Sequence, residues 1–514
     1  MFSVKDLKII DQKNRVFVEG LSFNLDKNDK IGIIGEEGNG KSTLLKIFAE
    51  VKDVDAFVKV SGQIISDMNF AYMAQSLEKV WLEQTLVDYL LKAHPDDEIE
   101  VEQYNQLQRI QKIAIDLHLP SDFILRDVLV KQLSGGEKVK LQLLKIMLYP
   151  FDGLLLDEPT NDLDISTLLW LEDFMKNCSV PLLFVSHDEV LLQNVANRIL
   201  HLEQLNKKTK CSHTLFRGCY EEYVASRLRY LHKEEQLAHK EKIAYFKKKE
   251  KLNQIMNAVG DALNDTVRDP TTARLLAKKM KAVKVMERRF EEEGYRHVDS
   301  VEEAIDVFFE PVGMPRGKCI LDVQLPVLKI EERVLLEDIH IQLYGNQKKV
   351  IVGDNGSGKT LLLRKLAKQL SQRKDIKLGY MPQNYMEGMN MEENGLRFIA
   401  FDGKLESMTR ARELLGRMKF TREEMEHPIH QLSYGQQAKL YLTKFIFDGC
   451  DVLLLDEPTR NLSPLTAPAI RRLLIDFNGA ILAVSHDRKF IEEVFSAQLV
   501  IEHQHLKEVI QEKN

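Results

Sequence analysis

Four short motifs occur twice in this chain, in the same order, and no other feature of the sequence constrains the fold as much. The first copies are GEEGNGKST from Gly35, LSGGE from Leu133, LLLDEPTNDLD from Leu154 and VSHD from Val185. The second copies are GDNGSGKT from Gly353, LSYGQQ from Leu432, LLLDEPTRNLS from Leu453 and VSHD from Val484. The 29 positions between Glu158 and His187 recur between the equivalent residues of the second half. The chain is therefore a duplication of one kind of domain.

Each half alternates between strand-like and helix-like stretches. Short apolar runs lead into the glycine-rich turns at Lys30–Ile34 and Lys348–Val352, and helical patterns follow at Thr43–Ala49 and Leu361–Leu370. Four more apolar runs are typical of strands that a parallel sheet buries on both faces: Gly153–Leu156, Leu182–Val185, Val452–Leu455 and Ile481–Val484. This alternation predicts an α/β fold that occurs twice.

Composition excludes several classes of protein. The 514 residues suffice for about three domains, and 44% hydrophobic residues exclude a wholly disordered chain. With 72 Lys and Arg against 78 Asp and Glu, the formal net charge is −6, so a nucleic-acid contact would need a local basic patch. Five cysteines without a CxxC pair argue against disulfide, zinc and iron–sulfur scaffolds. The charged N-terminus and the lack of apolar runs near the ~20 residues of a membrane span predict a cytoplasmic protein.

The segment between the repeats has a different character. From Arg227 to Arg289 it carries 17 Lys and Arg against 8 Asp and Glu. Apolar residues with a 4-3 spacing, interrupted by Glu235, Lys242 and Lys249, lie at Val224, Leu228, Leu231, Ala238, Tyr245, Leu252, Met256 and Val259, and again at Leu276, Met280, Val283 and Phe290. This spacing predicts an antiparallel helical hairpin with a narrow apolar seam. The alternative, a solvated charged linker, needs no seam.

We expect the turn of this hairpin between Gly260 and Pro270, after about 35 helical residues that span roughly 50 Å at ~1.5 Å each. The expected domains are 1–218, 219–316 with a tip at about 253–272, and 317–514. The tip is less charged and holds Leu252, Ile255, Met256, Val259, Leu263 and Val267. These side chains either contact bases or a nascent chain, or pack on each other to cap the hairpin.

The repeated glycine-rich motif fits the P-loop pattern, in which backbone N–H groups and a helix N-terminus surround a phosphate. Lys41 and Lys359 are expected to reach the β- and γ-phosphates. A hydroxyl for Mg²⁺ is expected from Ser42 and Thr360. The predicted nucleotide-binding residues of the two loops are Gly35, Gly38, Asn39, Gly40, Lys41, Ser42, Thr43, Gly353, Asn355, Gly356, Ser357, Gly358, Lys359 and Thr360.

Carboxylates end the buried strands of both halves. Asp157 and Asp456 need a partner for a buried charge, and Mg²⁺ is the natural one. The next residues, Glu158 and Glu457, point to the opposite side and are candidates to polarise the attacking water.

Histidines and glutamines follow other strands of each half. His187 and His486 stand at matched positions, which favours contact with the γ-phosphate over the role of an ordinary core histidine. Gln75 and Gln383, in AYMAQ and GYMPQ, are further candidates to bind Mg²⁺ or water.

The LSGGE and LSYGQQ motifs precede amphipathic stretches, of which Lys138–Tyr149 is one, and so provide a second helix N-terminus that favours an anion. The residues concerned are Ser134, Gly135, Gly136, Ser433 and Gly435. Because each half already has a P-loop, this second site is expected to serve the ATP of the other half. Two ATP molecules would then lie between the halves, close them when bound and release them after hydrolysis.

These motifs resemble those of the ATP-binding cassette superfamily, and the whole chain, hairpin included, resembles its ABC-F branch of tandem cassettes without transmembrane domains. The resemblance implies two P-loop NTPase domains joined by a long α-helical hairpin, a monomer with paired cassettes, no membrane subunit, and ATP hydrolysis with Mg²⁺ at two composite sites. In each half it implies a Walker B aspartate, a catalytic glutamate and a switch histidine: Asp157, Glu158 and His187, then Asp456, Glu457 and His486.

In the ABC-F branch the linker enters the ribosomal E site and points its tip toward P-site tRNA and the peptidyl-transferase centre. The resemblance therefore implies large-subunit rRNA and P-site tRNA as partners. Basic residues expected to contact RNA are Lys247, Lys248, Lys249, Lys251, Arg268, Arg274, Lys278, Lys279 and Lys281. Some members protect ribosomes from antibiotics and others regulate translation. The partly apolar tip, and a Gln75–Ser134 interval too short for an extra arm, favour protection.

Three positions depart from the family pattern. Tyr434 replaces the first glycine of the second signature, and Ser463 stands where the first half has Asp164. An aromatic residue that would stack on adenine is not evident before either P-loop, with Phe17 the nearest. We therefore expect the two sites to differ in turnover.

Two other functions fit the cassettes. A fused pair of transporter ATPase subunits would leave the basic hairpin without a role. A chromosome-associated or DNA-repair ATPase would need a longer coil or zinc-type cysteine spacing.

Overall fold

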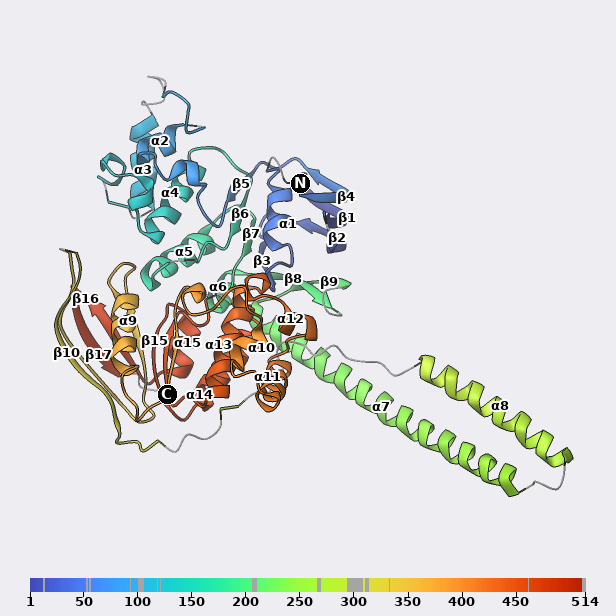
Figure 1. Ribbon diagram of the computed structural model, residues 1–514. Helices are drawn as coiled ribbons and strands as arrows, with labels where there is room; N and C mark the ends of the chain where they lie inside the picture. Colours follow the sequence, from blue (N-terminus) through green and yellow to red (C-terminus); the bar gives the residue numbers. More distant parts are fainter. Residues whose placement is uncertain are drawn as a thin grey trace. The chain divides into compact units, whose positions relative to one another are not determined.

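The computed structural model describes residues 1–514 except positions 13, 52–53, 55–56, 93, 100–105, 118, 121, 162, 206–209, 266–269, 294–307, 310–313, 332, 461 and 511–514. The chain divides into two units, Met1–Tyr220 with Val301–Asn514, and Glu221–Ser300 (Figure 1). The first unit holds both repeats, and the second lies between them in the sequence.

The first repeat contains two sheets. Strands β1 (Phe2–Asp11), β2 (Val16–Leu25) and β4 (Val58–Ser66) form an antiparallel sheet in the order β2-β1-β4. The second sheet has the order β5-β6-β7-β3-β8-β9 and is parallel except for its last pair. Its strands are β3 (Lys30–Gly35), β5 (Phe70–Met73), β6 (Gly153–Asp157), β7 (Leu182–Val185), β8 (Arg198–Leu205) and β9 (Lys210–Arg217).

Helix α1 joins these two sheets, because Phe2 of β1, Leu44 of α1 and Leu183 of β7 belong to one apolar cluster. The helices are α1 (Lys41–Phe48), α2 (Leu86–Leu91), α3 (Leu107–Asp116), α4 (Gly135–Met147), α5 (Ile165–Asn177) and α6 (Glu189–Val195). Short 3-10 turns lie at η2 (Lys79–Trp81), η4 (Phe123–Leu125) and η5 (Val130–Gln132).

The second repeat has the same plan, although its described strands form one sheet in the order β10-β11-β17-β16-β12-β15-β14-β13. The strands are β10 (Cys319–Ile330), β11 (Arg333–Tyr344), β12 (Lys348–Gly353), β13 (Leu378–Met381), β14 (Val452–Asp456), β15 (Ala480–Val484), β16 (Ala497–Glu502) and β17 (His505–Ile510). The helices are α9 (Lys359–Leu370), α10 (Gly395–Ile399), α11 (Leu405–Arg417), α12 (Arg422–Glu426), α13 (Tyr434–Asp448), α14 (Ala467–Asp476) and α15 (Arg488–Val494), with turns η6 (Tyr385–Glu387) and η7 (Ile429–Gln431).

The strand order positions the repeated motifs. In the first repeat β6, β7 and β3 are neighbours and parallel, and in the second β14, β15 and β12 are. All residues of β6, β7, β14 and β15 are buried, as expected for strands covered on both faces. The carboxyl ends of these strands, where the motifs begin, therefore meet at one edge of each sheet.

The α/β fold predicted for both halves is confirmed, with small differences at helix starts. Helix α1 begins at Lys41 rather than Thr43, and α9 begins at Lys359 rather than Leu361. Helix α4 begins at Gly135, so the signature glycines form its first turn. Among the described residues, no helix combines the length and apolar character that crossing a membrane requires.

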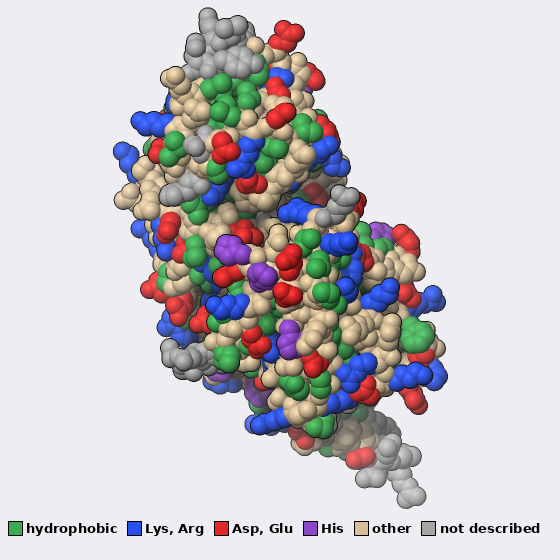
Figure 2. All heavy atoms as spheres, turned by 90° about the vertical axis from the view of Figure 1, so that its left-hand side faces the viewer, with side chains coloured by type: hydrophobic (Ala, Val, Ile, Leu, Met, Phe, Trp, Pro, Cys, Tyr) green, Lys and Arg blue, Asp and Glu red, His purple; other side chains and the backbone are tan. Residues whose placement is uncertain are grey.

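Charged side chains of both signs are mixed on the face drawn in Figure 2, where Lys and Arg lie among Asp and Glu. This mixture agrees with a formal net charge of only −6. It also means that this face offers no continuous basic field of the kind that attracts nucleic acid.

The second unit holds two helices, α7 (Tyr220–Asp265) and α8 (Pro270–Glu293). Val259 and Val283 are only 6% and 8% exposed, and Met280 lies 3.8 Å from the position a Cβ would take at Gly260. These contacts place an apolar seam between the two helices.

The predicted position of the turn is confirmed, and one detail of the predicted seam is wrong. Helix α7 ends at Asp265 and α8 begins at Pro270, so the break between the two helices falls between Gly260 and Pro270 as expected. Leu228 is 50% exposed rather than part of a seam. Of the predicted tip residues, Val267 lies outside the described residues, and Ile255 is exposed while Val259 is buried.

The seam can be tested by replacing Val283 with Asp. A carboxylate forced into this contact should destabilise the hairpin by on the order of 3 kcal/mol, because the buried charge would have no partner. Hydrogen exchange of the α7 and α8 amides measures the loss. The control is Val285→Asp, since Val285 is 50% exposed and should shift stability by less than about 0.5 kcal/mol. Equal effects of the two changes would contradict the seam.

Candidate active site

Both glycine-rich turns fold into loops around a lysine. The Lys41 ammonium donates hydrogen bonds to the carbonyls of Gly35 (2.8 Å) and Glu36 (2.9 Å). In the second repeat Lys359 donates to the equivalent carbonyls of the loop, at 2.7 and 2.8 Å. Burial lowers the pKa of both lysines, and the nearby Glu158 and Glu457 oppose this shift. Each loop thus holds one buried cation at the start of a helix.

Each loop ends at a position that only glycine can occupy. Gly40 and Gly358 have φ angles of 84° and 97°, in the left-handed region. A Cβ at Gly40 would lie 2.9 Å from the Cβ of Phe17, and one at Gly358 would lie 3.1 Å from a methyl group of Leu335. The loop therefore packs against an aromatic residue in the first repeat and an aliphatic one in the second.

The Walker-type aspartate of the first repeat sits beside the loop hydroxyl. Ser42 donates to Asp157 Oδ1 at 2.9 Å, and the Tyr72 hydroxyl donates to Oδ2 at 3.2 Å. Burial raises the pKa of Asp157, while Ser42 opposes the shift. In the second repeat burial raises the pKa of Asp456 to about 6, and the adjacent Thr360 opposes it.

The next residue in the first repeat is a glutamate paired with a histidine. Glu158 Oε1 lies 2.9 Å from His187 Nε2, and Glu158 is 6% exposed. Burial alone would raise the pKa of Glu158, but His187 and Lys41 together outweigh it and leave the pKa below its ordinary value. The other ring nitrogen of His187 lies 2.9 Å from the carbonyl oxygen of Leu462, which belongs to the other repeat.

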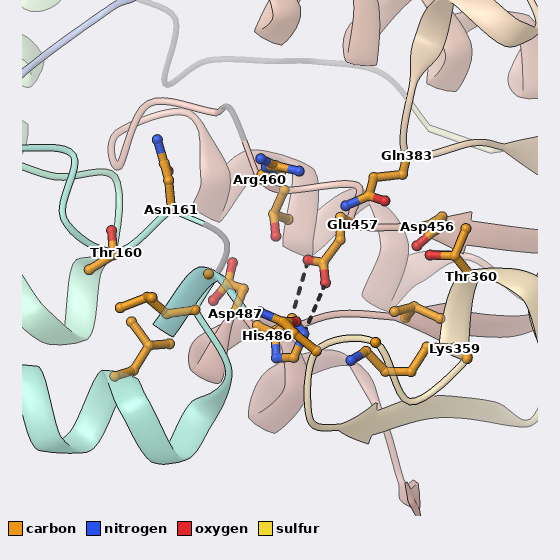
Figure 3. Close-up of a pocket in the computed structure, with 18 of the residues that line it drawn as sticks. Thr160, Asn161, Lys359, Thr360, Gln383, Asp456, Glu457, Arg460, His486 and Asp487 are labelled. Carbon is orange, nitrogen blue, oxygen red and sulfur yellow. Dashed lines mark hydrogen bonds and ion pairs between the residues drawn. The ribbon is translucent and has the colours of Figure 1, made fainter. Parts of the chain in front are cut away.

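The second repeat has the same residues in a looser arrangement. His486 Nε2 lies 3.8 Å from Glu457 Oε1, and the backbone N–H of His486 donates to Oε2 at 3.4 Å. Burial, reinforced by Asp456, raises the pKa of Glu457 to about 8, and burial lowers the pKa of His486 to about 4. Figure 3 shows Glu457 between Asp456, His486 and Gln383.

A cavity of about 710 Å³ opens at the second P-loop (Figure 3). Its lining from the second repeat includes Lys359, Thr360 and Glu457. Its lining from the first repeat includes Gly135 and Lys138, at the start of the first signature helix. The structure thus brings the P-loop of one repeat and the signature of the other to one cavity. Other predicted residues that line it are Asn355, Gly356, Gly358, Gln383, Asp456, His187 and His486.

Both signature serines cap helices. Ser134 accepts from the backbone of Glu137 at the start of α4, and Ser433 accepts from Gln436 at the start of α13. A Cβ at Gly136 would lie 2.7 Å from Thr167 Oγ1, so helices α4 and α5 approach closely there.

The second signature reaches the first P-loop. The Tyr434 backbone N–H donates to Glu37 Oε2 at 2.9 Å. Tyr434 and Gly435 lie in the first turn of α13. A tyrosine in place of the first signature glycine therefore does not stop the helix from starting here.

The remaining predicted residues are placed as follows. Gln75 is exposed, and Asn39 is 2% exposed and donates to the Leu202 carbonyl at 3.0 Å. Phe17, the aromatic residue considered for contact with adenine, lies beside Gly40 of the P-loop. The glycines Gly35, Gly38 and Gly353 have positive φ angles, and Thr43 and Ser357 lie in α1 and the second loop.

These residues fit ATP and Mg²⁺. The glycine-lined loops leave space that a Cβ would fill, next to a buried lysine. Within the described part of the chain, both oxygens of the fully buried Asp456 carboxylate lack a hydrogen-bond donor. Hydroxyl and carboxylate oxygens are the donor set that Mg²⁺ prefers beside a phosphate.

Some residues of the site were not found by sequence reasoning. Tyr72 donates to Asp157, and Arg364 lies in the cavity near Asp456 and Tyr380. The signal was present, because a tyrosine stands three positions before the glutamine in both AYMAQ and GYMPQ. Arg460, which lines the cavity where the first repeat has Asn161, was also missed.

Comparison with known proteins defines the class. A family model described as ABC transporter matches residues 18–161 and 336–460, more than half of the chain. The chain therefore belongs to the ABC transporter family and carries two ATP-binding cassettes in tandem, and the chemistry of that family is ATP binding and hydrolysis.

Its relatives narrow the class further. The chain is 29% identical to ATP-binding protein Uup of Buchnera aphidicola subsp. Schizaphis graminum, over 91% of this chain and 75% of that protein. It is 26% identical to ABC transporter F family member 2 of Arabidopsis thaliana, over 93% of this chain and 73% of that one. The predicted resemblance to ABC-F ATPases is confirmed.

Solved structures agree on the fold. The complex of archaeal ribosomal stalk protein aP1 and archaeal ribosome recycling factor aABCE1 contains a chain with a TM-score of 0.59 and 17% identity. The match covers 98% of this chain and 89% of that one, so both cassettes share the fold.

The tyrosine beside Asp157 gives a test of the site. Tyr72→Phe keeps the ring and removes the hydrogen bond to the carboxylate. A hydrogen bond to a charged group is worth about 1.5–3 kcal/mol, so the Mg²⁺ concentration needed for half-maximal ATP binding should rise about tenfold. Calorimetric titration of ATP at several Mg²⁺ concentrations measures it. Tyr149→Phe is the control, since Tyr149 is 56% exposed. An unchanged Mg²⁺ dependence in Tyr72→Phe would contradict the assignment.

Proposed function

We propose that this chain is an ATPase in which ATP closes two composite sites between the cassettes, and that the closed form binds the ribosome through the basic hairpin. The observation that carries the proposal is the cavity shared by the second P-loop and the first signature helix. A nucleotide in such a cavity contacts both cassettes, so its binding energy favours the closed arrangement. The contact of Tyr434 with Glu37 supports the matching pairing at the first P-loop.

The residues of each site take separate roles in this proposal. Lys41 and Lys359 hold the phosphates, and the serines of the opposite signatures, Ser134 and Ser433, hold the γ-phosphate from the other side. Bound Mg²⁺, held through the loop hydroxyl and the Walker B aspartate, would offset phosphate charge. Glu158 and Glu457 accept a proton from the attacking water.

The histidines complete the proposed sites. His187 and His486 follow β7 and β15, next to the P-loop strands, and each lies beside the glutamate of its own repeat. In this place an imidazole contacts the γ-phosphate and orients the glutamate.

The hairpin supplies the surface for RNA. Most of its candidate side chains are exposed, namely Lys247, Lys248, Lys251, Arg274, Lys278, Lys279 and Lys281. Lys249 is half-buried, and Arg268 lies outside the described residues. Exposed lysines and arginines on a long helix pair bind phosphates without reading sequence. The rest of the chain is acidic, which leaves the hairpin as the basic element.

The ribosome is the RNA partner we propose, with the E site, large-subunit rRNA and P-site tRNA as contacts and the cytoplasm as location. The similar solved chain is named a ribosome recycling factor, in complex with a ribosomal stalk protein. The resemblance to ABC-F proteins gives the E site and the direction of the hairpin tip.

We assign antibiotic protection as the finer role, with regulation of elongation as the alternative. Exposed Ile255 near the end of α7 supports an apolar tip that contacts its target. Fused transporter subunits, the alternative from another class, leave the basic hairpin without a function.

Removal of both catalytic carboxylates tests the proposal. The double variant Glu158→Gln/Glu457→Gln should bind ATP without hydrolysing it, so the closed form should accumulate on ribosomes. Sedimentation through a sucrose cushion with ATP, and with ADP for comparison, measures bound protein. We expect at least tenfold more variant than unmodified protein in the pellet with ATP, since hydrolysis no longer releases it.

Controls separate the parts of this proposal. In the same variant, Lys278→Ala/Lys279→Ala/Lys281→Ala should lower pelleting and its dependence on salt. Glu413→Ala in the second cassette should change neither. Protein that stays in the supernatant with ATP, or that follows membranes, contradicts ribosome binding.

Cell growth distinguishes protection from regulation. Cells that express the chain should tolerate at least fourfold more lincosamide, pleuromutilin or streptogramin A, because these drugs bind where the tip would reach. Broth dilution measures it, with Lys41→Ala/Lys359→Ala, which lacks the phosphate-holding lysines, as the inactive control. A change of growth rate without any change in drug tolerance would favour the regulatory role.

A further inference from the structure

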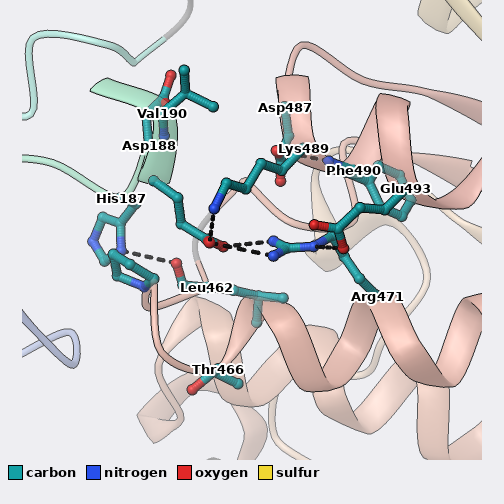
Figure 4. Close-up of polar contacts among 12 residues, drawn as sticks. His187, Asp188, Val190, Leu462, Thr466, Arg471, Asp487, Lys489, Phe490 and Glu493 are labelled. Carbon is teal, nitrogen blue, oxygen red and sulfur yellow. Dashed lines mark hydrogen bonds and ion pairs between the residues drawn. The ribbon is translucent and has the colours of Figure 1, made fainter. Parts of the chain in front are cut away.

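The two cassettes also meet away from the nucleotide sites, through buried ion pairs (Figure 4). Arg471 Nη1 of α14 lies 2.5 Å from Glu189 Oε1 of α6. Arg488 Nη1 of α15 lies 2.7 Å from Glu172 Oε2 of α5. Glu172, Glu189 and Arg471 are 5%, 7% and 2% exposed, and the side chain of Arg488 is 15% exposed. These are therefore not surface ion pairs screened by water and salt.

The sequence relates these two pairs to one another. Glu172 and Arg471 are 299 positions apart, and so are Glu189 and Arg488. The Walker B aspartates and the switch histidines have the same separation, so residues 299 apart are equivalent in the two repeats. Each ion pair is thus the counterpart of the other, with the roles of the repeats exchanged.

This correspondence reveals a division of charge. Both acidic members come from the first cassette and both basic members come from the second. In a contact of two first cassettes, the same geometry would place Glu172 against Glu189 twice. In a contact of two second cassettes, it would place Arg471 against Arg488 twice. Buried like charges at this distance are strongly unfavourable.

From this arrangement we infer that four residues form a pairing key: Glu172, Glu189, Arg471 and Arg488. The key makes the surface of the first cassette accept a second cassette of this protein and reject another first cassette. The key acts by opposing the wrong pairs as much as by favouring the right one. None of its four residues lines the nucleotide cavity. The inference does not depend on the ribosome as partner.

Two neighbouring ion pairs also take their cation from the second cassette, although Asp188 and its counterpart Asp487 are both acidic. Lys489 Nζ lies 3.2 Å from Glu189 Oε2, and Arg488 Nη2 lies 3.1 Å from Asp188 Oδ2. The residue equivalent to Lys489 in the first cassette is Val190, which carries no charge. In each of the described ion pairs that cross this contact, the cation comes from the second cassette.

Two groups belong to their own cassette and do not cross the contact. Lys176 lies 2.8 Å from Glu172, and Glu493 lies 2.7 Å from Arg471. They orient the key residues. Charge reversal of Glu172 or Arg471 would place a like charge beside Lys176 or Glu493, so the test must check that each variant folds.

Charge reversal in the full chain tests the key. The first variant is Glu172→Arg/Glu189→Arg, and the second is Arg471→Glu/Arg488→Glu. Alone, each has like charges across the contact, so its cassettes should separate and its radius of gyration in solution X-ray scattering without nucleotide should rise. Mixed in equal amounts, a basic cassette of one variant should pair with an acidic cassette of the other. Light scattering should then detect a species of about twice 59.4 kDa.

Glu19→Arg/Glu83→Arg makes the same change of charge at exposed ion pairs of the first cassette, and should leave both size and compactness unchanged. Circular dichroism checks folding. If reversal prevents folding, the neutral variant Glu172→Gln/Glu189→Gln should still be less compact than the unmodified chain. Compact single variants, a mixture that stays monomeric, or a compact neutral variant would overturn the key.

Discussion

The nucleotide sites depend on one constraint: a charge removed from water needs a partner close by. Lys41, Asp157 and Glu158 are all less than a tenth exposed. An uncompensated buried charge costs several kcal/mol, so each of these groups is tolerable only beside the others. The strand order β6-β7-β3 brings them together, because the carboxyl ends of neighbouring parallel strands lie at one edge of the sheet. The motif residues therefore need this sheet as much as they need each other.

Identical motifs do not give identical sites. Glu158 and Glu457 share a left-handed backbone, with φ angles of 48° and 52°. Only His187 is held on both sides, by its own glutamate and by the Leu462 carbonyl of the other cassette. His486 is farther from Glu457, and among the described residues its Nδ1 has no hydrogen-bond partner. The close His187 thus lowers the pKa of Glu158, while burial and Asp456 raise that of Glu457, although the two motifs are equivalent.

The sequence predicts those parts of the fold that depend on the residues of a single short segment. Apolar runs bounded by turns gave β6, β7, β14 and β15, and the glycine pattern gave both phosphate loops. The strained backbone at Glu158 could not be predicted, because sequence spacing carries no information on φ. Helix α7 continues through Gly260, beside Met280 of α8, despite a penalty of about 1 kcal/mol for a helical glycine. Contacts between distant segments, such as Tyr72 with Asp157, decide what local patterns leave open.

The ion pairs between the cassettes determine which cassette pairs with which, a choice that arises because the chain is a duplication. Two cassettes with the same nucleotide motifs can pair first with first, second with second, or first with second. P-loops and signatures cannot distinguish these, because both repeats carry them. Only positions at which the repeats differ can, and Glu172, Glu189, Arg471 and Arg488 differ in sign. Since a buried ion pair adds little net stability while a buried like-charge pair costs much, such positions discriminate between partners more than they stabilise one. ATP contributes nothing to this choice, so the discrimination has to reside in the protein surface.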